Sequence, residues 1–199
     1  MNGIEAVTLG ASAGGVSALL TLFHALPVDY AVPLVCVLHL PDDRHSHLAQ
    51  VFSRRLRRPV CEACDKQPVA PGMIYFAGPG YHLSVEQDRS FSLSQEERVH
   101  FSRPSIDVLF ESAADAYGPA LLGVLLTGAN EDGARGLARI KGLGGRTIVQ
   151  DPREAQVATM PRAALAFHHP DHILPLNGIG QLLATLELPE CQVNSKPNC

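Results

Sequence analysis

Short apolar runs alternate along the chain with longer segments of helical period, and turn residues such as glycine and proline separate them. The pattern predicts strands at 4–9, 32–39, 60–63, 73–76, 121–127, 146–150 and 172–174, and a hairpin of strands at 81–86 and 90–95. It predicts helices at 14–26, 45–57, 104–117, 132–143, 160–167 and 178–187, the third with Pro104 as its first helical residue. This alternation is typical of α/β proteins.

The run at 121–126 is apolar on both faces, as expected for a central strand of a parallel sheet that helices cover on both sides. We therefore expect a single-domain, doubly wound α/β fold with a mostly parallel sheet, helices on both faces and a small antiparallel hairpin. A length of 199 residues suits one core of this kind. Residues 1–188 are expected to form the domain, and residues 189–199 a polar C-terminal tail.

Composition and charge exclude several classes of protein. Hydrophobic residues make up 46% of the chain and charged residues 18%, which is ordinary for a globular domain. A net charge of -4 offers no basic surface for nucleic acid. The N-terminus lacks a signal-peptide pattern, and no apolar run approaches the ~20 residues of a membrane span. The sequence therefore predicts a cytoplasmic protein without membrane insertion.

Clusters of cysteine, histidine and arginine have simpler explanations than ligand binding. Cys61 and Cys64 have a metal-type spacing, but no second pair accompanies them, and five cysteines without repeated spacing argue against a disulfide framework. His45 and His47 also lack a further ligand at a suitable spacing. We predict no metal and no cofactor. The basic run at 54–58 suits a solvated helix end, with contact to an acidic partner as the alternative.

Three reactive side chains follow predicted strands. Ser12 follows the first strand, His39 closes the second, and Asp132 comes after the turn that follows the strand at 121–127. Ligands of open α/β sheets bind outside the carboxyl ends of the strands, so these side chains share one edge. A serine hydroxyl needs a base to remove its proton, and a histidine works best when a carboxylate orients it. Together they predict a catalytic triad.

Each member of this trio also has a structural explanation, and the glycine-rich turn at 10–15 has a second functional one. Ser12 and Asp132 could each cap a helix, and His39 could simply end a strand. A glycine-rich strand-to-helix turn also binds phosphate, which makes a nucleotide-binding module the alternative. That alternative lacks the usual G-x-G-x-x-G spacing, and a histidine stands where an acidic residue would close the second strand.

The motifs around these residues resemble those of the CheB-type protein-glutamate methylesterases of bacterial chemotaxis, over about residues 4–187. The turn at 10–15 (Gly-Ala-Ser-Ala-Gly-Gly) is similar to the family's Gly-Ala-Ser-Thr-Gly-Gly. His-Leu-Pro at 39–41 resembles its His-x-Pro, and Thr-Gly-Ala-Asn-Glu-Asp-Gly at 127–133 resembles its Thr-Gly-Met-Gly-x-Asp-Gly. The segment at 103–110 (Arg-Pro-Ser-Ile-Asp-Val-Leu-Phe) matches as well.

The resemblance implies a catalytic domain that hydrolyses γ-glutamyl methyl esters of chemoreceptors or related signalling proteins, giving glutamate and methanol, with deamidation of glutamine in some members. It implies Ser12 as the nucleophile, His39 as the general base and acid, and Asp132 as its orienting carboxylate. Residues of the oxyanion site and substrate pocket would be Ala13, Gly14, Ala129, Asn130 and Arg103. Ala129 and Asn130 stand where the family has methionine and glycine.

Family members usually carry an N-terminal receiver domain, whereas three residues precede the first predicted strand here. We therefore expect a catalytic module standing alone. Three alternatives are open for it: constitutive activity, excision from a longer protein, or control by a separate receiver protein. A non-catalytic relative that binds signalling partners is a further alternative, because the turn at 127–133 departs from the family's pattern.

Overall fold

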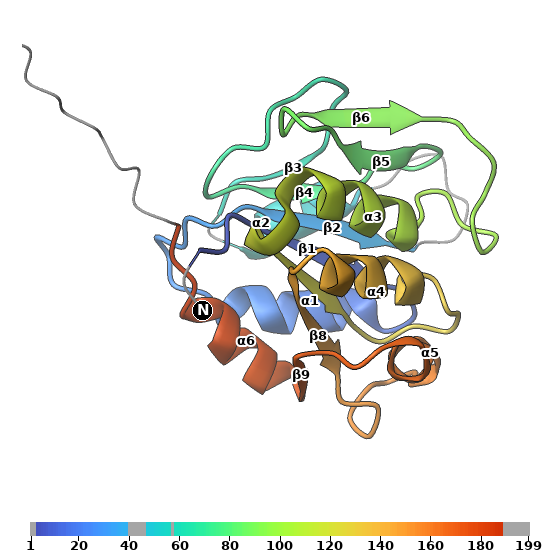
Figure 1. Cartoon of the computed structure of the whole chain (residues 1–199). Helices are drawn as coiled ribbons and strands as arrows, with labels where there is room; N and C mark the ends of the chain where they lie inside the picture. Colours follow the sequence, from blue (N-terminus) through green and yellow to red (C-terminus); the bar gives the residue numbers. More distant parts are fainter. Residues whose placement is uncertain (1–2, 40–46, 57, 189–199) are drawn as a thin grey trace, which may run out of the picture.

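Seven parallel strands form one sheet in the order β3-β4-β2-β1-β7-β8-β9 (Figure 1). This computed structural model describes residues 3–39, 47–56 and 58–188. The strands of the sheet are β1 (Ala6–Ala11), β2 (Leu34–Leu38), β3 (Val60–Glu62), β4 (Ile74–Phe76), β7 (Leu121–Leu125), β8 (Arg146–Gln150) and β9 (His172–Leu174). A separate antiparallel hairpin consists of β5 (His82–Val85) and β6 (Phe91–Ser94).

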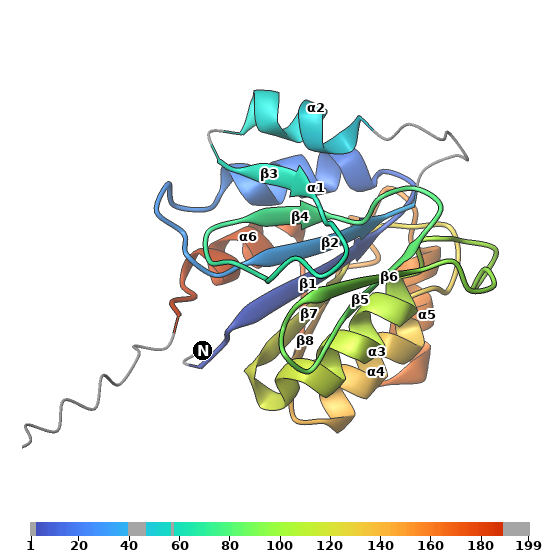
Figure 2. The same cartoon turned by 90° about the horizontal axis from the view of Figure 1, so that it is seen from above.

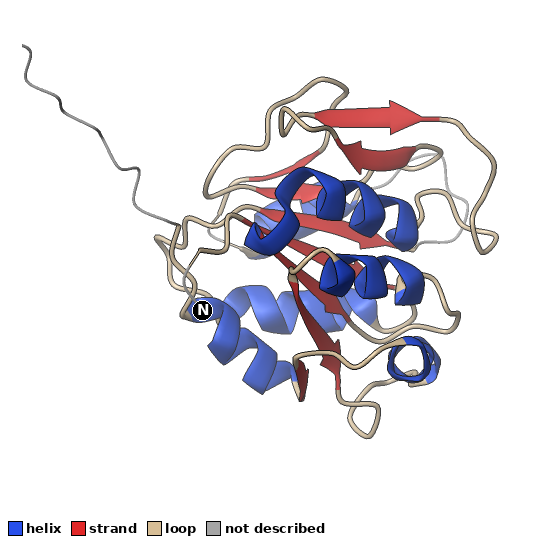
Figure 3. Cartoon of the chain, viewed as in Figure 1, coloured by secondary structure: helices blue, strands red, loops and turns tan. Residues whose placement is uncertain are grey.

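Helices cover both faces of the sheet (Figure 2). One face carries α1 (Gly15–His24), α2 (Leu48–Arg55) and α6 (Leu176–Ala184), and the other carries α3 (Ile106–Tyr117), α4 (Ala134–Gly142) and α5 (Thr159–Phe167) together with the hairpin. A short 3-10 helix, η1 (Gly118–Ala120), leads from α3 into β7. Figure 3 shows the strands between the two layers of helices. The predicted doubly wound α/β fold is confirmed.

Two hydrophobic cores lie on opposite faces of the sheet. The first includes Leu19 and Phe23 of α1 and Ile179 of α6, and the second includes Phe110 of α3 and Leu137 of α4. Every residue of β1, β2 and β7 is buried, because helices pack on both sides of these central strands. The sheet therefore separates two cores and holds the carboxyl ends of its middle strands in fixed positions.

Helix α3 starts later than the sequence predicts. Its first residue is Ile106, with Ser105 as the N-cap, whose Oγ accepts a hydrogen bond from the amide of Val108 at 3.4 Å. Pro104 therefore lies before the N-cap, and the prediction that it is the first helical residue is wrong. The reason is tertiary: the carboxylate of Asp132 accepts a hydrogen bond from the amide of Ile106 at 2.7 Å and thereby sets where the helix begins.

Other predicted elements differ from the observed ones mainly at their ends. The helix expected at 132–143 begins at Ala134, and the one expected at 178–187 runs from Leu176 to Ala184. Residues 45–46 and 57 of the second expected helix lie outside the described residues, as does the expected tail at 189–199. The domain boundary at residue 188 stays a prediction. Within the described ranges, no helix has the length and apolar character needed to cross a membrane.

Candidate active site

The carboxyl ends of β1, β2 and β7 meet in the middle of the sheet. Strand β1 pairs with β2 so that Ala11 lies opposite Leu38, and the next residues are Ser12 and His39. The amide of His39 donates to the carbonyl of Ala11 at 3.0 Å, and the amide of Ser12 donates to the carbonyl of Thr127, after β7, at 2.9 Å. Ser12 and His39 thus leave neighbouring strands side by side, and the strand order reverses between β1 and β7, next to Ser12.

The glycines of the turn after β1 are needed for its shape. Gly14, the N-cap of α1, has φ 82°, a left-handed conformation that side chains other than glycine rarely adopt. A Cβ atom on Gly14 would lie 2.5 Å from Gln156 Oε1, and one on Gly10 would lie 2.3 Å from Ile106 Cγ2. The turn can therefore bend sharply while it packs against α3 and the loop before α5.

Two backbone amides beside Ser12 are available for a ligand. Other amides of the turn already have acceptors: the amide of Gly15 donates to the carbonyl of Ser12 at 2.8 Å, and the amide of Ser12 donates to the carbonyl of Thr127. Thr127 Oγ1 also donates to the carbonyl of Ala13 at 2.8 Å, which fixes the turn. The structure shows no acceptor among the described residues for the amides of Ala13 and Gly14. These N–H groups at the start of α1 can stabilise a developing negative charge.

His39 and Asp132 form a hydrogen-bonded pair. His39 Nε2 lies 2.8 Å from Asp132 Oδ2, and the carboxylate is fully buried. It also accepts from Ser105 Oγ and from the amides of Ile106 and Asp107, at 2.7 to 2.9 Å. Burial raises the pKa of the Asp132 carboxyl, but the hydrogen bonds from His39 and the two amides outweigh it and hold the pKa below its usual range. The ionised carboxylate therefore places the proton of a neutral His39 ring on Nε2.

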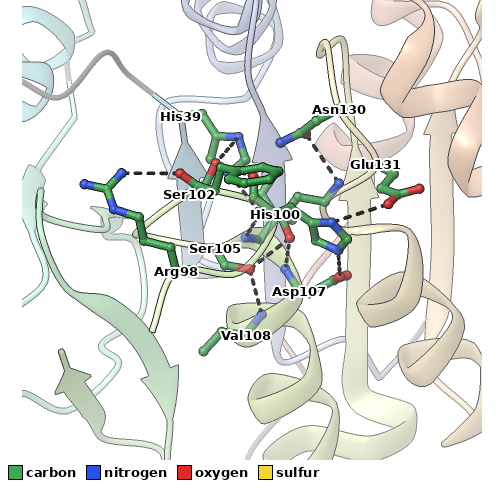
Figure 4. Close-up of polar contacts among 12 residues, drawn as sticks. His39, Arg98, His100, Ser102, Ser105, Asp107, Val108, Asn130 and Glu131 are labelled. Atoms are coloured by element: carbon green, nitrogen blue, oxygen red, sulfur yellow. Dashed lines mark hydrogen bonds and ion pairs between the residues drawn. The ribbon is translucent and has the colours of Figure 1, made fainter. Parts of the chain in front are cut away.

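A second serine, Ser102, faces the other nitrogen of the His39 ring (Figure 4). Its Oγ lies 3.4 Å from His39 Nδ1 and 3.5 Å from the carbonyl oxygen of His100. Ser12 Oγ takes part in no hydrogen bond within the described part of the chain. Because Nε2 binds Asp132, Nδ1 is the nitrogen that must accept a proton from a nucleophile. In this structure its hydroxyl neighbour is Ser102.

The turn that carries Ser102 has a strained backbone. His100 and Phe101 have φ 48° and 62°, and the residues on either side of them exchange two backbone hydrogen bonds. A two-residue hairpin turn with both φ values positive favours asparagine and glycine. The His100 ring lies 3.4 Å from Asp107 Oδ2 and 3.5 Å from Glu131 Oε1, whereas the Phe101 side chain is 95% exposed. Contacts of His100 hold the turn beside His39.

A cleft of about 370 Å³ opens beside Ser12 and His39. Its lining residues among those described are Ser12, Gly14, Gly15, Val16, Ser17, Leu20, Leu38, His39 and Arg55. A serine hydroxyl, an imidazole and the start of a helix therefore share one cleft, which is an arrangement that can support acyl transfer.

Comparison with known proteins shows the family of the chain. The model of the family described as CheB methylesterase matches residues 7–183. The chain belongs to the CheB methylesterase family. It is 44% identical over 183 residues to a protein of Leptospira interrogans named "Putative protein-glutamate methylesterase/protein-glutamine glutaminase", covering 92% of this chain and 95% of that one. The family match disfavours the nucleotide-binding alternative.

Further CheB methylesterase relatives extend the comparison. The chain is 37% identical over 177 residues to the protein-glutamate methylesterase FrzG of Myxococcus xanthus, covering 89% of this chain but 53% of FrzG. The chain thus spans about half the length of that relative. The crystal structure of the Thermotoga maritima CheB methylesterase catalytic domain superposes with a TM-score of 0.85 and 29% identity, covering 91% of this chain and 97% of that one.

The structure brings together only some of the predicted site residues of this family member. Gly14 lines the cleft and Ala13 precedes it, whereas Ala129, Asn130 and Arg103 are not among its lining residues. Asn130 Oδ1 accepts from the amide of Asp132 at 3.3 Å, within its own turn. The Arg103 guanidinium donates to two backbone carbonyls at 2.9 and 3.0 Å, an arrangement that braces the loop before α3.

One group of residues resembles a metal site. His100, Asp107 and Asp132 each place a possible ligand atom within 4.8 Å of the others. Both oxygens of Asp132 already accept hydrogen bonds from protein donors, so they offer a cation little. Burial raises the pKa of the Asp107 carboxyl, although the amide of Gly136 lowers it by donating to Oδ1 at 2.7 Å. These contacts describe a hydrogen-bonded network around the Asp132 carboxylate.

Proposed function

We propose that this chain is a serine hydrolase that removes methyl esters from glutamate side chains of chemoreceptors or related signalling proteins, with Ser12 as the nucleophile. The observation that carries this proposal is the His39–Asp132 pair, 2.8 Å apart, at the strand end next to Ser12 in a CheB methylesterase. The reaction gives glutamate and methanol. A separate receiver protein as regulator and a cytoplasmic location stay predictions.

The proposed mechanism uses each group according to its position. Ser12 Oγ attacks the ester carbonyl while His39 Nδ1 accepts the hydroxyl proton, and Asp132 stabilises the imidazolium that forms. The amides of Ala13 and Gly14 donate to the oxyanion of the tetrahedral intermediate, where one such donor contributes about 10²–10³ in rate.

After methanol has left, water repeats the attack in place of the serine. His39 gives its proton to the departing methanol, which leaves an ester between Ser12 and the glutamyl side chain. His39 then accepts a proton from water, the water oxygen attacks this ester, and glutamate leaves as Ser12 regains its proton. Deamidation of glutamine follows the same steps with ammonia as the leaving group. The relative from Leptospira interrogans carries both activities in its name.

Two serines flank His39, so the assignment of Ser12 needs a direct test. In this structure the serine within hydrogen-bonding distance of His39 Nδ1 is Ser102, whose Oγ lies 3.4 Å away. The backbone amides without an acceptor among the described residues, however, adjoin Ser12. We expect Ser12→Ala to lower methanol release from a methylated receptor by at least about 10³-fold and to abolish labelling by a fluorophosphonate. The matched variant Ser102→Ala should stay within about 10-fold of the unchanged enzyme, because the oxyanion site and the His39–Asp132 pair remain.

The result that would contradict the assignment is equally definite. Full activity of Ser12→Ala, or fluorophosphonate found on the peptide that contains Ser102, would show that Ser102, in the turn before α3, is the nucleophile. A folded protein that releases no methanol and takes no label at either serine would favour the non-catalytic alternative.

A further inference from the structure

Arg55 brings a positive charge to the cleft that holds Ser12 and His39. It is the last residue of α2, its side chain is exposed, and it lines the cleft together with these two residues. Arg54 precedes it on the same helix and is also exposed, but it is not among the lining residues. Neighbouring arginines of the same helix turn therefore differ in their access to the reaction site.

The rest of the cleft is neutral or titratable. Apart from His39, the lining residues that the structure describes are glycines, serines and the apolar Val16, Leu20 and Leu38, and none is acidic. No ion pair joins Arg55 to a carboxylate in the described ranges. A cation at the end of a helix interacts favourably with the last carbonyl groups, but Arg54 does this equally. The helix end alone does not explain why one guanidinium faces the cleft.

The ester itself does not require this charge. A glutamyl methyl ester is neutral, whereas unmodified glutamate and aspartate side chains near it on the substrate carry negative charge. A guanidinium binds a carboxylate through charge-assisted hydrogen bonds, and the exposed Arg55 side chain can meet one at the cleft. Arg55 therefore complements an anionic neighbour of the ester.

We propose that Arg55 forms a carboxylate subsite, which binds an acidic side chain of the substrate next to the methyl ester that Ser12 attacks. This inference rests on the proposed function and adds a specificity to it. Each hydrolysed ester leaves a glutamate, so one reaction in a substrate segment creates a ligand for Arg55 when a neighbouring ester enters the cleft. The enzyme then favours esters in acidic, already demethylated segments.

A pair of peptides tests the subsite. Both carry one glutamyl methyl ester in the same sequence, with either glutamate or glutamine at the positions three and four residues to each side, which share a helix face with the ester. We expect the unchanged enzyme to favour the glutamate peptide by about 5-fold to 10-fold in kcat/KM, chiefly through KM. Arg55→Gln should abolish this preference, and Arg54→Gln, which removes the same charge outside the cleft, should keep it.

Binding to the Ser12→Ala variant separates the subsite from the chemistry. Titration of this variant with the two peptides should show the same preference, and adding Arg55→Gln should remove it. Equal affinity for both peptides, or an equal loss of kcat on both in Arg55→Gln, would overturn the subsite. If the unchanged enzyme hydrolyses neither peptide while Ser12→Ala still binds the glutamate peptide more tightly through Arg55, the proposed function fails and the subsite stands.

Discussion

The Asp132 carboxylate binds the His39 ring and the start of α3 at the same time. One of its oxygens meets His39 Nε2 and the amide of Ile106, and the other meets Ser105 Oγ and the amide of Asp107. The positive end of the helix dipole adds to the stabilisation of the negative charge. The residue that we propose orients the base therefore also fixes where a helix begins.

Asp132→Asn is expected to damage both roles. Its amide group has one acceptor oxygen instead of two, so it cannot bind His39 and the α3 amides together. We expect methanol release to fall by about 10³–10⁴-fold and the free energy of unfolding by about 1–3 kcal/mol. Methanol assays and urea unfolding of the same preparations measure the two effects.

Ser105→Ala is the matched control, because it removes one donor to Asp132 and the cap of α3 but leaves the carboxylate on His39. It should cost about 1 kcal/mol of stability and less than about 10-fold in activity. An activity loss as large as that of Asp132→Asn would show that the helix start, rather than the carboxylate, supports the base.

Sequence reasoning could propose Ser12, His39 and Asp132 as a site because each follows a strand that its apolar run predicts. It missed Ser102, whose place beside His39 depends on a hairpin turn, and it offered the basic run at 54–58 an acidic partner without placing Arg55 at the cleft, which depends on the packing of α2. Neither residue stands in a strand-end motif. Their proximity comes from loops and helices that fold back over the sheet, which no local pattern records.

At the scale of elements, Asp107 joins α3 to α4. Its Oδ1 accepts from the amide of Gly136 at 2.7 Å, and its Oδ2 lies 3.4 Å from the His100 ring. Burial raises the pKa of this carboxyl, the Gly136 amide lowers it, the charges of Asp132 and Glu111 raise it, and His100 lowers it, with a net upward shift. The folded protein therefore holds a proton on Asp107 at pH values where the unfolded chain has lost it.

This upward shift predicts the direction of a pH effect. The stability that Asp107 contributes is fully present below its unfolded pKa of about 3.9 and is lost as pH rises through its higher folded pKa. Asp107→Asn cannot titrate but still offers an oxygen to Gly136. We expect the variant to be more stable relative to the unchanged protein at pH 7 than at pH 4, which means that the difference in free energy of unfolding, variant minus unchanged protein, is larger at pH 7. Urea unfolding at both values measures it.

The control for this prediction is Asp115→Asn on the same helix, where the carboxylate is exposed and pairs with Arg139 at 2.7 Å. Removing the Asp115 carboxylate should not give the gain in relative stability at pH 7 over pH 4 that we expect for Asp107→Asn. A difference between Asp107→Asn and the unchanged protein that does not vary with pH would contradict the upward shift.

The predicted elements were located by their apolar patterns, and their ends were set by contacts that lie far away in the sequence. Helix α3 begins at Ile106 rather than at Pro104 because Asp132, which follows β7, binds its first amides. Proline is favoured at a first helical position, yet that preference is weak beside a buried carboxylate with two amide partners. Local preference therefore predicts the helix and misplaces its start.

At the scale of the molecule, one sheet supports two cores. Phe52 of α2 lies in an aromatic cluster with Phe23 and Phe76, at ring-centroid distances of 5.9 and 4.7 Å, on one face. Phe110 of α3 is fully buried in the core of the other face. Strands β1, β2 and β7 contribute side chains to both, so neither core can be lost without exposing the strands that the other packs on.

This shared sheet predicts that both cores unfold together. Phe52→Ala and Phe110→Ala should each lower the free energy of unfolding by about 3–5 kcal/mol, in one transition of unchanged steepness in urea. The chain has no tryptophan, so far-ultraviolet circular dichroism and hydrogen exchange at Leu19 of α1 and Leu109 of α3 report the two faces. Their protection should decrease by the same free energy in both variants. Loss of protection at Leu19 alone in Phe52→Ala, with Leu109 unaffected, would mean that the faces unfold independently and that the cleft beside α1 can open while the second core persists.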